Sequence, residues 1–146
     1  MKRVVTFLII AASLLMLTAC DGGQYKDVTP SPDAVDTVYM QKTVIEGENK
    51  YTYKEKKIDQ SDEIVSFLKK LDEIRFEEIE PVEFSKVDFL IVFDGKKKHK
   101  MLFLDDEIIY DGRAYKSVKG SLKKTVSKLY DALEGSELDT TSKLFS

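Results

Sequence analysis

The sequence of 146 residues contains one cysteine, one histidine and no strong excess of either charge. With Cys20 as its only cysteine, the chain forms no internal disulfide, so packing must stabilise its folded part. Any Ser-His-Asp arrangement would have to use His99, and no Gly-x-Ser-x-Gly, phosphate-binding glycine loop or His-Glu-x-x-His motif occurs. A formal net charge of −3 argues against nucleic acid as a partner, which favours a clustered basic excess. No motif indicates a catalytic residue, a cofactor or a metal.

The first twenty residues have the organisation of a bacterial lipoprotein signal. Lys2 and Arg3 precede the uncharged residues 4–17, and the lipobox-like Leu17-Thr18-Ala19-Cys20 ends the segment. The uncharged run is shorter than the roughly 20 residues that a helix needs to span a bilayer. We therefore expect cleavage after Ala19 and lipidation of Cys20. A spanning helix and an ordinary secretory signal with an accidental cysteine are the alternatives.

Lipidation of Cys20 would place the protein on the cell membrane, facing outside the cytoplasm. The thiol would carry diacylglycerol, and the new amino group is commonly acylated, for example with palmitate. Two fatty chains suffice for stable anchoring. The covalent lipid is therefore the expected link to the membrane.

Composition divides the chain into four parts. Residues 1–19 are the expected signal peptide, and residues 20–36, with two of the three prolines, are expected to be a lipidated, flexible tether. Residues 37–135 suit one small domain, and residues 136–146 after Gly135 are expected to be a loose tail.

The first half of the domain predicts a hairpin and a helix. Alternating residues 38–44, turn residues 46–49 and an extended stretch 51–58 form the hairpin. The helix is expected to begin at Asp59 as N-cap and to end near Glu73. Its predicted buried face is marked by Ile64, Leu68 and Leu71, helped by Val65.

The second half predicts a meander and a closing helix. Strands are expected at 87–93, 101–104, 107–110 and 114–118, with Asp94-Gly95 and Asp111-Gly112 as turns. A helix over 119–135, capped by Ser117 or Ser121, completes an α+β domain with a small antiparallel sheet. Residues 89–93 and 101–104 are apolar at both odd and even positions, so both faces of the hairpin that they form should be covered. Either the first hairpin covers the second face, as in a curled half-barrel, or a patch remains for a partner.

Three groups of charged residues are candidate sites. The lysines of the run after Asp94-Gly95 could contact anionic headgroups or wall polyanions, although charged residues at a hairpin tip also suppress edge pairing: Lys96, Lys97, Lys98 and Lys100. Two acidic groups are expected to be solvated loops. The first consists of Glu77, Glu78, Glu80 and Glu83. The second could hold calcium, although it lacks the EF-hand pattern, and consists of Asp105, Asp106, Glu107 and Asp111. His99, within the lysine run, is expected at the surface.

Three short motifs stand before predicted elements: Ile58-Asp59 before the first helix, Val87-Asp88-Phe89 before the second hairpin, and Tyr115 before the final helix. With the anchor, they resemble small lipoproteins of Bacillus-type bacteria, of the YhfM kind, over residues 37–134. The resemblance implies a Gram-positive membrane lipoprotein without an established activity and carries over no functional residue except Cys20.

Two classes of function follow. The favoured one is a lipid-anchored extracytoplasmic binding or accessory module, with an envelope protein or peptide as partner. The alternative is a small cell-envelope hydrolase that uses paired carboxylates, because such pairs have no spacing rule in sequence.

Overall fold

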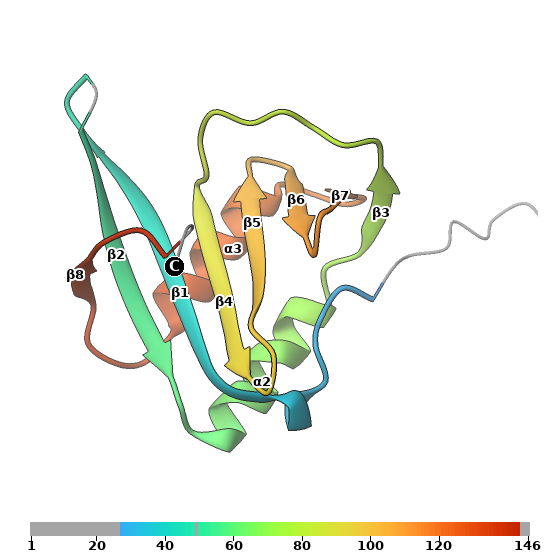
Figure 1. Cartoon of the computed structure of the whole chain (residues 1–146), viewed down its shortest axis with the longest axis vertical. Helices are drawn as coiled ribbons and strands as arrows, with labels where there is room; N and C mark the ends of the chain where they lie inside the picture. Colours follow the sequence, from blue (N-terminus) through green and yellow to red (C-terminus); the bar gives the residue numbers. More distant parts are fainter. Residues whose placement is uncertain (1–26, 49, 144–146) are drawn as a thin grey trace, which may run out of the picture.

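The computed structural model describes residues 27–48 and 50–143 (Figure 1). The predicted lipidation site Cys20 and the lipobox residues Leu17, Thr18 and Ala19 lie outside these ranges. Within them, no helix has the length and apolar character needed to cross a membrane.

An eight-stranded sheet forms the body of the protein. Its strands lie in the order β3-β7-β6-β5-β4-β1-β2-β8, and every neighbouring pair is antiparallel. The predicted α+β class with an antiparallel sheet is therefore confirmed. The strands are β1 (Val35–Glu46), β2 (Lys50–Ile58), β3 (Phe76–Ile79), β4 (Phe89–Gly95), β5 (His99–Leu104), β6 (Glu107–Tyr110), β7 (Arg113–Ser117) and β8 (Leu138–Thr140).

Helices α2 (Ser61–Asp72) and α3 (Leu122–Ala132) pack on the same face of the sheet (Figure 1). Between the helices and the sheet lies the main core, which includes Phe67, Leu71 and Val126. The expected burial of α2 needs one correction: Val65 is 47% exposed, whereas Phe67 is 3% exposed. Positions 64, 67, 68 and 71 follow the helical repeat, and residue 65 lies beside that stripe.

The first helix ends at Asp72 with Glu73 as C-cap, as predicted, but other helix ends differ from expectation. The N-cap of α2 is Gln60 rather than Asp59, and the Asp59 carboxylate instead pairs with Lys57 at 2.9 Å. Helix α3 is shorter than the predicted 119–135. Of the two predicted caps, Ser117 and Ser121, it is Ser121 whose hydroxyl accepts from the Lys124 backbone N–H. Local capping chemistry thus fixes the start of α3.

Lys56 on β2 holds the end of α3 against the sheet. Its ammonium donates to the backbone carbonyls of Tyr130 and Leu133 at 3.1 and 3.0 Å. The same nitrogen lies 5.0 Å from the centroid of the Tyr130 ring. Burial, together with the hydrogen bond from its hydroxyl to Glu137, raises the pKa of Tyr130 above its ordinary value. A cation at the helix C-terminus also complements the helix dipole.

The predicted tether is too long. Val28 is 5% exposed within the core, the Thr29 hydroxyl donates to Asp72 on α2, and residues Pro32–Ala34 form a short 3-10 helix, η1, before β1. Residues 27–36 are therefore part of the domain, because Val28 finds its apolar contacts among residues distant in sequence. Residues 20–26 lie outside the described ranges.

Two segments expected to be loops or loose chain are strands. Part of the first acidic group forms β3, which pairs with β7 and buries Phe76. In the expected tail, β8 pairs with β2. In addition, Asp94-Gly95 continues β4 rather than turning, because Gly95 pairs with Val35. The Asp111-Gly112 turn is confirmed, and both residues have positive φ, 48° and 77°.

Candidate functional site

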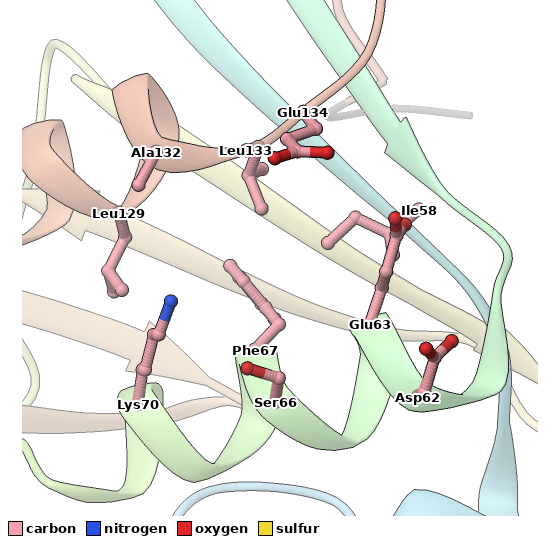
Figure 2. Close-up of a pocket in the computed structure, with 10 residues that line it drawn as sticks. All are labelled: Ile58, Asp62, Glu63, Ser66, Phe67, Lys70, Leu129, Ala132, Leu133 and Glu134. Carbon is pink, nitrogen blue, oxygen red and sulfur yellow. The ribbon is translucent and has the colours of Figure 1, made fainter.

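A groove of about 320 Å³ runs between α2 and α3. Its apolar lining comes from three separate elements, with Ile58 at the end of β2, Phe67 on α2, and Leu129 and Leu133 at the end of α3 (Figure 2). Ile58 and Phe67 are buried, whereas both leucines are partly exposed. The groove therefore offers apolar surface to solvent on top of a packed core.

The charges of this groove are separated along its length. Carboxylates of Asp62, Glu63 and Glu134 lie toward one end, and the Lys70 ammonium lies toward the other (Figure 2). Lys70 follows Glu63 by seven positions, which is about 10 Å along the helix axis. Asp62 and Glu63 stand in the first turn of α2 and Lys70 in the last, where each sign suits the helix dipole.

None of these four charged side chains forms an ion pair or side-chain hydrogen bond within the part of the chain that the structure describes. An acidic end, an apolar floor and one lysine complement a ligand that carries a cation beside an apolar body. Across residues 27–48 and 50–143, no group of three His, Cys, Asp or Glu residues could hold a metal ion.

The opposite face of the sheet is also apolar, as the two hairpin strands predict. Leu90, Val92 and Leu102 form a second buried cluster there. The sequence left open whether the first hairpin covers this cluster or leaves a patch; β1 and β2 extend the same sheet beside β4. The chain beyond β8 crosses in front of β1 (Figure 1).

A groove of about 280 Å³ lies beside this crossing segment. Its lining includes two exposed aromatic residues, Tyr51 and Phe84. The buried Leu90 and the partly exposed Ser142 also line it. Lys86 at its rim pairs with Asp88 at 3.0 Å. Burial favours the protonated form of Asp88, but Lys86 and Lys123 outweigh it and hold the pKa of that carboxyl below its usual value.

Three lysines of the predicted site lie at the tip between β4 and β5, whereas the fourth, Lys100, lies within β5 opposite Val92. Lys96, Lys97 and Lys98 follow Gly95, which packs directly against Ala34. The lysine run thus stands beside the segment through which the N-terminal part of the chain joins the sheet. Contact of these lysines with an anionic surface stays a prediction.

His99 and two members of the second acidic group, Asp106 and Asp111, serve local structure. His99 Nδ1 lies 3.0 Å from Asp111 Oδ2, and its ring lies 6.0 Å from that of Tyr110. Asp106 accepts a hydrogen bond from the Leu122 backbone N–H at the start of α3. Because these carboxylates point to different partners, the arrangement does not form the calcium loop considered from sequence.

Comparison with known proteins gives no relative: no protein family, no curated protein and no solved structure matches the chain.

Proposed function

We propose that the protein is a lipid-anchored, extracytoplasmic binding module and that the groove between α2 and α3 is its binding site. The observation that carries this proposal is the groove itself, with partly exposed leucines between unpaired carboxylates and an unpaired lysine. Binding sites commonly combine apolar surface with a few polar groups that fix orientation. The expected partner is an envelope protein or peptide that presents a cation next to apolar side chains.

The same geometry favours binding over hydrolysis by paired carboxylates. Asp62, Glu63 and Glu134 are all exposed on an open groove. A general acid is usually kept protonated by an apolar, buried environment. The three carboxylates are better suited to attracting a cation.

The anchor would keep the domain close to the membrane. Only residues 21–26 separate Cys20 from Asp27, the first residue of the described part. Fully extended, this stretch reaches at most about 25 Å. The domain therefore belongs within reach of membrane-bound partners.

Changing Cys20 to Ser is expected to move the protein from the membrane fraction to the soluble or secreted fraction. The hydroxyl cannot replace the thiol as acceptor of diacylglycerol, so the fatty chains that hold the protein would be missing. Mass spectrometry of the membrane form should show a lipidated N-terminal residue 20. A wild-type protein with an unmodified thiol at residue 20 would contradict the anchor.

A photocrosslinking side chain at position 66 tests the groove. Ser66 lines the groove, whereas Val65 is exposed on the same helix but does not line it. In intact membranes we expect a defined crosslinked product from position 66 and none from position 65. Combining the probe with Glu63→Gln and Glu134→Gln should reduce that product, because the acidic end would lose its attraction for a cation. Equal products from both positions would refute the groove as the binding site.

A further inference from the structure

Two buried polar side chains form a pair on the face of the sheet opposite the helices. Gln41 on β1 and Glu55 on β2 are directly opposite each other across the hairpin. They are 2% and 8% exposed, and the Gln41 amide nitrogen donates to the Glu55 carboxylate at 2.9 Å. Burying an amide and a carboxylate is costly unless both are fully hydrogen-bonded. This pair therefore calls for a partner that satisfies its remaining groups.

The chain's own segment supplies that partner. The Gln41 amide nitrogen also donates to the Thr141 carbonyl at 3.0 Å, and the Gln41 amide oxygen accepts from the Lys143 backbone N–H at 2.9 Å. One side-chain amide thus contacts the backbone at two alternate residues. Such contacts recognise an extended main chain without regard to the side chain between them.

The side chain that follows is recognised by charge. The Lys143 ammonium lies 2.7 and 2.6 Å from the two oxygens of Glu55. The same nitrogen lies 3.7 Å from the centroid of the Tyr39 ring. A carboxylate and an aromatic face around one ammonium select a lysine over a neutral side chain.

Around β8 the segment is also held by polar contacts: Lys54 pairs with Asp139 at 2.9 Å, and the Tyr130 hydroxyl donates to Glu137 at 2.9 Å. Strand β8 has three residues, which pair only with Tyr53, Lys54 and Glu55 at the edge of the sheet. Leu138 is 60% exposed. Short edge segments of this kind open locally at a small fraction of the cost of unfolding the whole domain.

We infer that Tyr39, Gln41 and Glu55 form a binding site for an extended peptide that carries a lysine, and that residues 141–143 occupy this site as an intramolecular ligand. The site is independent of the groove between α2 and α3, which lies on the other face of the sheet. A tethered ligand has a high effective concentration, so a free peptide gains access only when the internal contact is weakened.

The test uses the full chain with Lys143→Ala and a fluorescent peptide that copies residues 136–146. We expect the peptide to bind this variant at least about tenfold more tightly than it binds the unmodified protein, measured by fluorescence anisotropy. A peptide with Ala in place of its lysine should lose that binding, and so should the native peptide on the double variant Lys143→Ala, Glu55→Gln. Equal binding of the two peptides, or no binding by a folded variant, would overturn the inference.

A second variant tests the same inference without depending on the folding of Lys143→Ala. A protease site placed at the exposed Gly135 and Ser136 allows the segment to be cut after the protein has folded. The cut segment should then exchange with a labelled copy, and the copy lacking the lysine should not exchange. If the protein unfolds when the segment leaves, the segment is part of the fold and the site is not a separate binding site.

Discussion

Replacing Leu71 by Ala should lower the free energy of unfolding by about 3 kcal/mol. Leu71 is fully buried near the end of α2, in the core between the helices and the sheet. Truncation removes apolar contacts and leaves a cavity, a combination that costs about 2–5 kcal/mol in well-packed cores. Urea denaturation at neutral pH measures the loss, and the melting temperature should fall by more than about 8 °C.

Val65 on the same helix provides the matched control. Changing Val65 to Ala also removes apolar atoms, but this side chain is largely exposed. The expected change is within about 0.5 kcal/mol, as for most surface substitutions. A loss as large as that of Leu71→Ala would mean that α2 faces the sheet with a different side.

The orientation of α2 shows how well helical periodicity in the sequence predicts the buried side of a helix. The repeat of Ile64, Leu68 and Leu71 correctly predicts the buried side, because each residue advances about 100° around the helix. Phe67 belongs to the same stripe and could have been added from that spacing alone. Val65 is apolar but lies beside the stripe. Its expected burial is wrong because it rests on the hydrophobicity of the residue and not on its angular position around the helix.

The errors in the predicted domain boundary and turn arise from contacts between residues that are distant in sequence. Nothing local marks Val28 as a core residue, since its neighbours include glycines and prolines. Likewise, Asp94-Gly95 has the composition of a turn, yet Gly95 pairs with Val35 some sixty residues earlier. Local propensity is overridden in both places by tertiary pairing.

The candidate sites differ in how accessible they were to prediction. The pair of Gln41 and Glu55 follows from the register of the first hairpin, because both residues lie at equal distance from its turn. The pairing was therefore accessible from the sequence, but the burial of the pair was not, because β2 consists mostly of polar and charged residues. The groove between α2 and α3 had no signal in the sequence, because it depends on how two helices from opposite halves of the domain pack together.

Replacing Gly95 by Ala should destabilise the protein by about 2–3 kcal/mol, within the range for overpacked sites. A Cβ atom at this position would overlap the carbonyl oxygen of Ala34 and lie 3.3 Å from the Cα of Val35. These are backbone atoms, so no side-chain rotation relieves the overlap, and the start of β1 would have to shift away from β4. Faster amide exchange in residues 32–38 should accompany the loss of stability.

Gly47→Ala separates this steric effect from backbone strain. Gly47 has a φ of 75°, but nothing lies within 4 Å of a Cβ built there. Its substitution should therefore cost only the strain of a left-handed conformation, about 1 kcal/mol, without affecting exchange at η1. If Gly95→Ala costs no more than Gly47→Ala, the close approach of β4 to Ala34 is not tight. In that case the segment before β1 would be held chiefly by Val28 and by the Thr29–Asp72 hydrogen bond.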